Sequence, residues 1–508
     1  MNFLFRSDWG LFLIFLAGIT VFLGIATLLL KKLDVHPHVT RRLVHIFVGC
    51  LTCAAPFFIE SKTPVLIIAL LFAILNFIAI KLNLLKSIHE TSRVSYGTVY
   101  FPIAFFILVC WFWDKDPAIL LTAMLIMSFG DPVASWVGES RKKPLGFTIL
   151  TEKKSVQGSL SMFLVSFVVA VLSMKIFRDV FPHQADITWS IAIVFGLFAG
   201  FFSAGAETIS HKGTDNLMVP LGAGVILDAL YNGAPEFQTH LMIWMSLTVA
   251  IATIAYASSA LSLSGAVGAW LLGTVVFGLG GVEWMLPIAV FFFFSSIFTK
   301  MGKKHKKKLA TVFEKTGKRD IFQVFANGGV AMIATMCWHF LNTTELFWYM
   351  IFLGSIAAAT ADTWGTEIGA FSSHDPISIL NFKKVPQGTS GGLTIIGTVG
   401  AFTGAFLIAL VGKYSLLYFA GINMTWTAVL LISIVGLIGA FVDSFLGASV
   451  QAQYHCPTCK KLTEKTSHCE NKNIPLASGY KKINNDFVNF CNTLAGGLLG
   501  GLAYLLIK

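Results

Sequence analysis

The sequence has few charged residues. Only 12% of its 508 residues are Asp, Glu, Lys or Arg, and 55% are hydrophobic. Soluble globular domains carry about 25% charged residues, so this composition excludes an ordinary soluble domain. Apolar runs of about 15–25 residues recur from one end of the chain to the other, and each is long enough to cross a bilayer as a helix. The composition therefore predicts an all-α integral membrane protein that has the lipid bilayer as a partner.

Acidic residues are the scarcer charge. The chain has 26 Asp and Glu against 37 Lys and Arg, which gives a net charge of +11. No soluble basic domain with interleaved aromatic residues is present to bind nucleic acid, so we expect no nucleic-acid partner. Basic loops on the cytoplasmic face of a membrane explain the excess of positive charge.

The apolar runs predict about sixteen membrane-spanning helices. We expect them near residues 9–30, 43–59, 64–80, 98–113, 118–138, 158–174, 188–206, 217–233, 241–260, 264–279, 284–299, 327–341, 346–371, 391–411, 425–449 and 486–507. A polar, turn-rich stretch at 231–239 divides them into two sets of eight. We therefore predict two membrane domains, 1–235 and 240–508, which have the same orientation because each has an even number of spans.

The basic connections predict the orientation. When Lys31 and Lys32 are placed in the cytoplasm, the alternation of spans also places the long basic run 300–319 there. Every loop that carries a motif then faces the cytoplasm, where nucleotides are found. We interpret Arg41, Arg42 and Arg93 as positive-inside anchors, and His45 as a hydrogen-bonded helix residue.

Two common nucleotide-binding motifs are missing, because the chain has neither GxxxxGK[ST] nor an evident GxGxxG. Instead, one pattern occurs twice. Asp131 and Asp362 each lie seven residues before a Gly. The motif KKxxQG begins 22 residues after the first Asp and 21 residues after the second, and a Ser or Thr follows it. Two matches in the same order predict a duplicated unit.

The apolar segments contain carboxylates, which are costly there. A charged group at the bilayer centre costs about 2.5–3.5 kcal/mol on insertion scales, so it usually faces a polar interior. Together with lysines and Gly/Ser/Thr turns, such carboxylates suit phosphoryl transfer, because they hold Mg²⁺ while the other groups bind phosphate. The candidate Mg²⁺ ligands are Asp131, Glu207, Asp215, Asp362, Asp443 and Asp486, and the candidate catalytic residues are Asp131, Asp362 and Glu367.

The candidate nucleotide- or phosphate-binding residues come from the repeated motif and its surroundings. They are Lys153, Lys154, Gly158, Ser159 and Asn216 in the first half, and Lys383, Lys384, Gly388, Thr389 and Ser390 in the second. We expect Gly158–Ser159 and Gly388–Gly392 each to open an apolar helix, where backbone N–H groups are available to phosphate.

Three of the eight cysteines lie in one polar loop, 451–485. Cys456 and Cys459 form a CxxC pair, and His468 and Cys469 follow it. Thiolate and imidazole ligands at this spacing suit a structural Zn²⁺ ion, with His455 as an alternative ligand. A loop without metal is the other interpretation, and a cytoplasmic location disfavours a disulfide. The remaining cysteines, Cys50, Cys53, Cys110, Cys337 and Cys491, are interpreted as small residues in or beside the spans.

On these motifs the chain resembles two known families. The first half, through about residue 230, resembles the membrane family of phytol kinase and dolichol kinase in RRLVH (41–45), SYGTVYFP (95–102), GDPVASWVG (130–138), KKSVQGS (153–159) and TDNLMVPL (214–221). The second half, from about 245, resembles the phytyl-phosphate kinase family and related uncharacterised transmembrane proteins. It does so in LSLSGAVGA (261–269), QVFANGG (323–329), ATADTWGTEIG (359–369), KKVPQGTSGG (383–392) and DSFLGA (443–448).

The resemblance implies a CTP-preferring lipid-alcohol kinase fused to a lipid-monophosphate kinase. It implies nucleotide and metal roles for Asp131, Lys153, Lys154, Glu207, Asp215 and Asn216, and for Asp362, Glu367, Lys383, Lys384, Asp443 and Asp486. We therefore predict a bifunctional isoprenoid salvage kinase that converts a prenyl alcohol to its monophosphate and then to its diphosphate, using CTP or another nucleoside triphosphate with Mg²⁺. The alternatives are a CTP-dependent lipid cytidylyltransferase, a transporter of lipid or phosphorylated lipid, and a chain in which one half is an inactive scaffold.

Overall fold

A computed structural model describes residues 7–33, 37–82, 95–140, 144–149, 152–181, 187–306, 318–341, 344–459, 462–464, 466–469, 471–472 and 474–508. Arg93 and most of the basic run 300–319 lie outside these residues, and so does the side chain of Arg41. The chain divides into two compact units, Met1–Thr239 and His240–Lys508, called here the first and second units.

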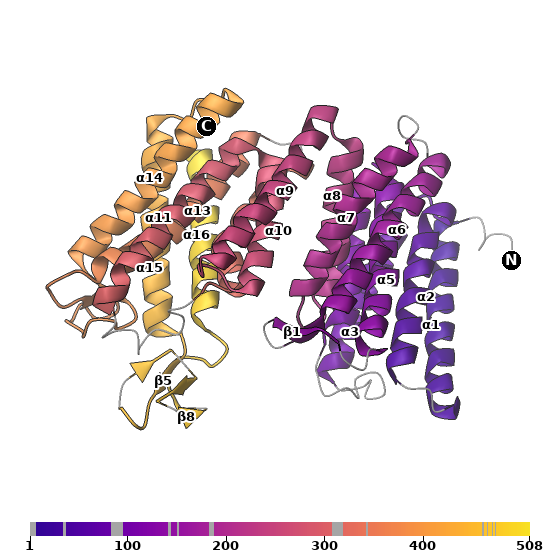
Figure 1. Ribbon diagram of the computed structural model, residues 1–508, viewed down its shortest axis with the longest axis horizontal. Coiled ribbons are helices and arrows are strands. Elements are labelled where there is room, and N and C mark those ends of the chain that lie inside the picture. The colour runs from indigo at the N-terminus through magenta and orange to yellow at the C-terminus, as the bar shows by residue number, and fades with distance from the viewer. Residues whose placement is uncertain are drawn as a thin grey trace. The chain divides into compact units, whose positions relative to one another are not determined.

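The first unit consists of helices and one β-hairpin (Figure 1). Its helices are α1 (Asp8–Leu33), α2 (Pro37–Phe58), α3 (Lys62–Lys81), α4 (Gly97–Phe112), α5 (Pro117–Ser140), α6 (Val156–Val180), α7 (Trp189–Ile209) and α8 (Asp215–Asn232). The antiparallel strands β1 (Gly146–Ile149) and β2 (Glu152–Ser155) connect α5 to α6. Helix α5 packs against α2, α6 and α8, so the residues of its second half lie among several other helices.

The second unit has the same succession of eight helices. They are α9 (Pro235–Ala257), which begins shortly before the boundary, α10 (Leu263–Gly280), α11 (Val282–Lys306), α12 (Ile321–Leu341), α13 (Glu345–Gly369), α14 (Ile395–Ala420), α15 (Trp426–Ser449) and α16 (Asn485–Ile507). Helix α13 packs against α11, α12, α14, α15 and α16. Its contact with α16 depends on glycine, because a Cβ at Gly354 would lie 2.3 Å from the carbonyl oxygen of Gly496.

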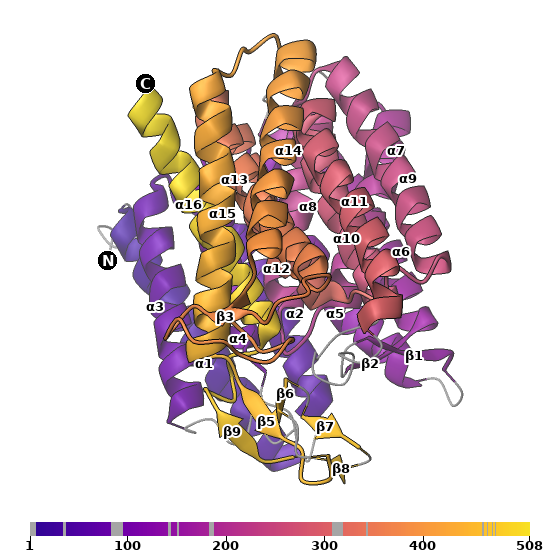
Figure 2. The same cartoon turned by 90° about the vertical axis from the view of Figure 1, so that its left-hand side faces the viewer.

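Short strands occupy the connections of the second unit. Strands β3 (Ile377–Ser378) and β4 (Gly392–Leu393) pair in the connection from α13 to α14. The loop between α15 and α16 contains the sheet β6–β5–β9 (Leu462–Thr463, Gln453–His455 and Leu476–Ser478) and the pair β7–β8 (Ser467–His468 and Asn471–Lys472). Figure 2 shows these strands beyond the ends of α15 and α16.

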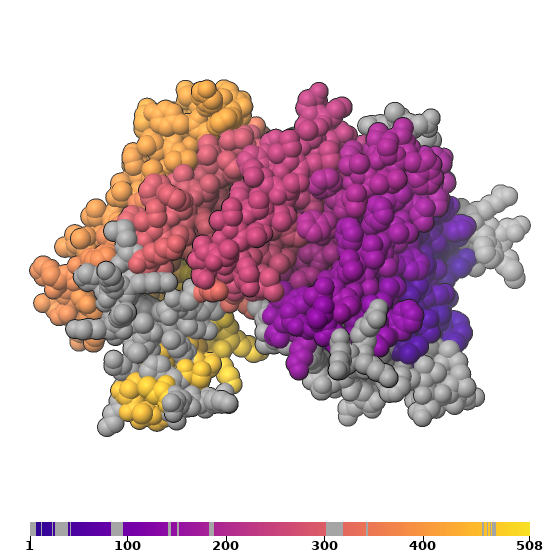
Figure 3. All heavy atoms as spheres, in the orientation of Figure 1, coloured from indigo at the N-terminus to yellow at the C-terminus, as the bar shows by residue number. Residues whose placement is uncertain are grey.

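Within the described residues, twelve helices are long and apolar enough to cross a membrane: α3, α5, α6, α7 and α9 to α16. Shorter apolar helices cover Asp8–Phe22, Arg42–Phe58 and Gly97–Phe112. Each of the sixteen predicted ranges overlaps one helix from α1 to α16. The prediction of an all-α membrane protein is therefore confirmed, whereas the count of sixteen spans stays a prediction. Within each unit, side chains fill the spaces between neighbouring ribbons (Figure 3).

The two units repeat one local arrangement. In each, a pair of short strands leads into a helix whose N-cap hydroxyl accepts a hydrogen bond from a glycine N–H. The N-cap Ser155 accepts from Gly158 at 3.1 Å, and the N-cap Thr394 accepts from Gly397 at 3.1 Å. Both glycines let the helix approach the preceding long helix closely, α5 in the first unit and α13 in the second.

Candidate functional site

The first candidate site is centred on Lys154 at the end of the β-hairpin. Its Nζ donates hydrogen bonds to Glu207 Oε1 at 2.5 Å and to the Glu207 carbonyl oxygen at 2.9 Å. The two side chains are only 19% and 10% exposed, so this ion pair is largely shielded from solvent. Strand β2 supplies the lysine and the last turn of α7 supplies the carboxylate.

Two further carboxylates act on the same lysine. Burial lowers the pKa of Lys154, but Glu207, Asp215 and Asp131 together outweigh it, and the pKa is raised above its usual value. The structure therefore brings together carboxylates from α5, α7 and the start of α8 around one ammonium group. Three carboxylates and one ammonium leave an excess of negative charge, which suits a divalent cation.

The donor set of this site fits Mg²⁺. Glu207 Oε2 is buried and has no hydrogen-bond partner within the described part of the chain. Oxygen ligands are what Mg²⁺ prefers, and it usually takes one or two carboxylates together with substrate phosphates. Glu207, Asp131 and Asp215 would therefore hold the ion in this unit.

The loop before α8 is hydrogen-bonded to, and closely packed against, the start of α4. The N–H of Tyr96 donates to the carbonyl of Lys212 at 3.0 Å. Gly213 has φ +91°, and a Cβ there would lie 2.4 Å from the nitrogen of Gly97, so glycine is required at this close approach. The SYG stretch thus fixes the loop that leads to Asp215. Asn216 is buried in the same turn.

The remaining predicted residues of the first unit differ in their exposure to solvent. Lys153 is exposed, because neighbouring residues of a strand point to opposite faces. Gly158 and Ser159 lie in the first turn of α6, as predicted, and Ser159 Oγ lies 3.1 Å from Thr208 Oγ1 at the end of α7. The phosphate-binding roles of all three residues stay predictions.

Arg42 has a more specific environment than the anchoring role expected for it. Its Nη2 donates to Ser135 Oγ at 3.0 Å and forms an ion pair with Glu139. Both partners lie on α5, four and eight residues after Asp131. Arg42 therefore fixes α2 against the functional end of α5. The sequence signal was the RRLVH motif, which does not show the partners.

The second candidate site contains carboxylates from two long helices. Asp443 of α15 interacts with Asp362 of α13 and, less strongly, with Glu464 of the α15–α16 loop. Asp443 Oδ2 is buried and accepts no hydrogen bond from a described residue. Asp486 is buried in the first turn of α16. Paired carboxylates with a buried open oxygen fit a magnesium ion in this unit as well.

Glu367 lies five residues nearer the end of α13 than Asp362, about one and a half turns, and has a cationic neighbour. Its Oε1 accepts from Thr299 Oγ1 of α11 at 3.1 Å. Burial lowers the pKa of Arg319, and the charge of Glu367 opposes that effect. The backbone of Arg319 pairs with Ala260 and Ser262, which holds it at the start of α10. Sequence reasoning missed Arg319, because nothing distinguishes it within a long basic run.

The second lysine pair does not repeat the geometry of the first. Lys383 and Lys384 are both exposed, and Lys384 pairs through its backbone with Ile377. The prediction that Gly388–Gly392 opens a helix is wrong. Gly388, Thr389 and Ser390 lie in the loop before β4, and α14 begins only at Ile395 because its N-cap is Thr394.

This loop nevertheless lies near the second site. A Cβ at Gly447 of α15 would lie 2.8 Å from Ser390 Oγ, and one at Gly391 would lie 2.4 Å from the Cβ of Ala448. Gly447 follows Asp443 by about one helical turn. The small side chains of the loop therefore let it pack directly on the carboxylate-bearing helix.

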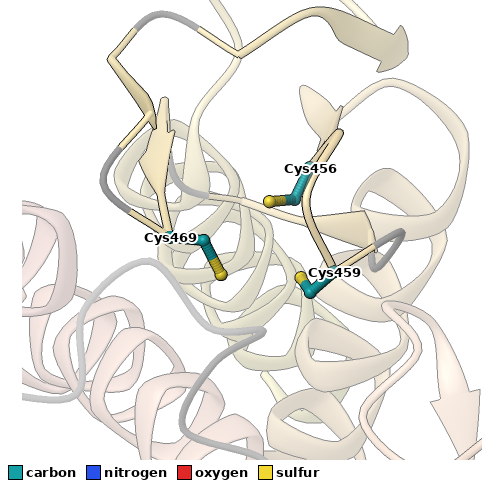
Figure 4. A group of neighbouring side chains, drawn as sticks. All are labelled: Cys456, Cys459 and Cys469. Carbon is teal, nitrogen blue, oxygen red and sulfur yellow. The ribbon is translucent and has the colours of Figure 1, made fainter.

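Three thiols converge in the α15–α16 loop (Figure 4). The Sγ atoms of Cys456, Cys459 and Cys469 all lie within 4.8 Å of one another. Desolvation, and the hydrogen bonds and charges of Cys459 and Cys456, raise the pKa of Cys469 to about 11. The side chain of His468, the fourth predicted ligand, lies outside the described residues.

Comparison with known proteins places these sites in a family. Residues 246–497 match the family described as Integral membrane protein DUF92. A phytol kinase from Synechocystis is 33% identical over 205 residues, which cover 39% of this chain and 82% of the relative. The chain belongs to the phytol kinase-like family of membrane proteins. The resemblance expected from the motifs is thus confirmed at the level of this family.

Two plant proteins are also similar to this chain. Protein PGR from Arabidopsis thaliana is 28% identical over 54% of this chain and 99% of its own length. Protein VTE6, a chloroplastic protein of the same plant, is 25% identical over 47% of this chain and 64% of its own length. No solved structure matches the chain.

Proposed function

We propose that the chain is a membrane kinase of isoprenoid salvage, which phosphorylates a prenyl alcohol in the first unit and the resulting monophosphate in the second. The observation that carries the proposal is the cluster around Lys154, where Glu207, Asp131 and Asp215 surround one ammonium group. A relative that is named phytol kinase supports the substrate class. Catalysis of phosphoryl transfer depends mainly on positioning the reactants and on stabilising the charge of the transition state. The charged groups of this cluster could supply both.

In the first site, the charged groups would act together. Glu207, Asp131 and Asp215 would hold Mg²⁺, which when bound would supply positive charge to neutralise the nucleotide phosphates. Lys154 would stabilise the oxygens of the phosphoryl group in transfer, and its ion pair with Glu207 holds its ammonium in place beforehand. Asp131 would accept the proton of the prenyl hydroxyl. The apolar tail would remain among the membrane-facing helices.

In the second site, an arginine takes the place of the lysine. Arg319 would bind the phosphate of the prenyl monophosphate, because a guanidinium matches phosphate oxygens in two parallel hydrogen bonds. Glu367, beside it, would orient that guanidinium, and Asp362 with Asp443 would hold Mg²⁺. Lys383, Lys384 and the loop Gly388–Gly392 would approach the nucleotide only after a local movement, because both lysines are exposed.

The location that this function requires is the cytoplasmic face of the membrane. The net charge of +11 and the clustering of basic residues near the motifs follow the positive-inside rule. CTP and other nucleoside triphosphates are available on that side. We propose that both sites open to the cytoplasm.

A product assay tests the function. The full-length protein in detergent would receive Mg²⁺, CTP or ATP, and a panel of prenyl alcohols and prenyl monophosphates, and lipid products would be resolved by mass. We expect products heavier by one phosphate group from both substrate classes. Addition of CMP would instead identify a cytidylyltransferase. If no nucleotide is consumed and labelled lipid exchanges across proteoliposomes, the chain is a transporter.

A further inference from the structure

The α15–α16 loop carries three thiols that the proposed kinase reaction does not use. Cys456 and Cys459 lie at the two ends of one turn after β5, Cys469 lies in the turn between β7 and β8, and the three side chains point toward one another (Figure 4). Tetrahedral zinc with Zn–S bonds of about 2.3 Å requires sulfurs about 3.8 Å apart. The three sulfurs already lie within 4.8 Å of one another, so small side-chain rotations would bring them to the spacing of three of the four ligands.

The hydrophobic core of the loop is small. Among the described residues it consists of Ala452, Tyr454, Cys456 and Ile474, with Cys459 packed against them. Its strands are only two or three residues long. A core of this size cannot offset the conformational entropy of ordering a loop of more than thirty residues, and small units of this kind usually need a metal or disulfides.

The loop is also attached to the second candidate site. The N–H of Ala452 donates to the carbonyl of Ile483 at 2.8 Å, and the N–H of Tyr480 donates to the carbonyl of Val450 at 3.0 Å. These bonds close the base of the loop where α15 ends and α16 begins. Glu464 follows β6, and its charge acts on Asp443 of α15. The fold of the loop therefore decides whether an acidic side chain stands beside the carboxylate pair.

We propose that Cys456, Cys459 and Cys469 bind a structural Zn²⁺ ion, which fixes the loop and thereby holds Glu464 next to Asp443. Zinc suits this role because it binds thiolates tightly and takes no part in redox chemistry. Binding of the metal would stabilise the folded loop directly, since the ligands come together only when the loop is folded. The proposal concerns metal content and loop order, and it stands whether or not the chain is a kinase.

Metal analysis of purified protein tests the zinc site. We expect about one Zn²⁺ per chain in the unmodified protein and in the control Cys491→Ser, whose cysteine lies in α16 outside the loop. We expect Cys456→Ser and Cys469→Ser to lose most of this zinc while they remain monodisperse. Equal zinc in all four proteins, or no zinc even after Zn²⁺ is added and excess removed, would overturn the proposal.

A second measurement uses the unmodified chain and does not depend on how the variants fold. Thiol-specific labelling in native detergent solution would be counted by mass before and after treatment with a zinc chelator. We expect three additional labelled cysteines after chelation, at Cys456, Cys459 and Cys469, together with faster proteolysis of the loop. Full labelling before chelation, or a disulfide between Cys456 and Cys459, would contradict zinc binding.

Discussion

Lys153 and Lys154 are adjacent in β2, but their side chains have different environments. Strand β2 exposes Lys153 and turns Lys154 toward Glu207, since successive residues of a strand face opposite sides. Asp131 and Asp215 add their charges to the environment of Lys154. The sequence motif KK therefore contains one largely shielded, paired cation and one solvent-facing cation.

Replacing Lys154 should abolish most of the first phosphorylation. Lys154→Met removes the only ammonium known to lie among Glu207, Asp131 and Asp215 in the described residues, so we expect turnover of prenyl alcohol to fall at least about 100-fold. Phosphorylation of added prenyl monophosphate should remain within about twofold. Product mass, measured for each substrate separately, checks both statements.

The comparison variant is Lys153→Met, which should lose much less turnover than Lys154→Met because the side chain of Lys153 is exposed. The pH profile offers a further check. The neighbouring carboxylates raise the pKa of Lys154, so its stabilising charge is complete below about pH 10 and is lost only above that. The effect of Lys154→Met should therefore be constant from pH 6 to 9; an effect confined to one end of that range would contradict the assigned role.

Arg319 should have the corresponding role in the second unit. Arg319→Met removes the cation beside Glu367, and we expect phosphorylation of prenyl monophosphate to fall by about 10²- to 10³-fold. Arg319→Lys should recover only part of the rate, since an ammonium cannot make two parallel hydrogen bonds to phosphate.

The neighbouring Lys318→Met is the matched control, because Lys318 is exposed and its Nζ lies over the ring of Tyr256, 5.7 Å from the centroid. Steady-state rates with prenyl monophosphate would be compared for all three variants. Equal losses in Lys318→Met and Arg319→Met would mean that general positive charge, rather than Arg319 itself, matters.

At the scale of elements, the helices that follow the hairpins depend on glycine. A Cβ at Gly397 would lie 2.8 Å from Thr394 Oγ1 and 2.9 Å from the carbonyl oxygen of Gly365. Gly397→Val should therefore force α14 away from α13 and destabilise the protein by about 1–3 kcal/mol. Thermal unfolding in detergent measures this loss. Gly18→Val is the control, since a Cβ at Gly18 meets nothing within 4 Å; equal destabilisation there would contradict the close approach.

The ends of α5, α6 and α8 far from Asp131 are tied by a buried polar network. Arg178 Nη2 donates to Asp116 Oδ2 at 2.5 Å and to Asn232 Oδ1 at 3.0 Å. Asp228 accepts from Asn232 at 2.8 Å and from Lys115 at 2.9 Å. The side chains of Arg178 and Asp116 are only 6% and 1% exposed. This network fixes the helices whose opposite ends form the first site.

Breaking that network should be costly. Arg178→Met leaves Asp116 buried without its charged partner, and the expected loss of stability is about 3–5 kcal/mol. Lys62→Met removes the exposed ion pair with Asp114 and should change stability far less, because exposed ion pairs contribute little. Thermal unfolding in detergent compares the two variants. Similar melting temperatures for both would show that the buried network contributes little.

At the scale of the whole molecule, the apolar runs predicted the helices well because the bilayer imposes one requirement along the chain. A segment must satisfy its own backbone hydrogen bonds in lipid, so length and hydropathy predict a helix without knowledge of its neighbours. Each predicted range overlaps an observed helix for this reason. Among the candidate residues, Glu207 was predicted to have a partner by the rule for carboxylates within apolar segments, and Lys154 is that partner.

The site of the second unit was harder to predict. The Asp-to-Lys spacing is nearly the same in both units, but the lysines do not occupy equivalent positions in the two structures. The connection there is longer and pairs β3 with β4, which leaves Lys383 and Lys384 exposed and places the glycine that matches Gly158 at Gly397. Arg319 reaches Glu367 from a loop that precedes α12, and no pattern in one sequence records such a long-range contact.

In the proposed function, the two units hold separate kinase sites that act one after the other. Asp131→Asn and Asp362→Asn each remove one carboxylate from one unit, with almost no change in volume. The most direct measurement supplies Mg²⁺, nucleoside triphosphate and a prenyl alcohol to each variant and to the unmodified protein, and follows both products by mass over time.

We expect Asp131→Asn to form neither product from the alcohol but to convert separately added monophosphate to diphosphate. Asp362→Asn should accumulate monophosphate and form no diphosphate. If Asp131→Asn also fails to convert added monophosphate, if Asp362→Asn forms no monophosphate, or if both variants form diphosphate from the alcohol normally, the assignment of one step to each unit is wrong.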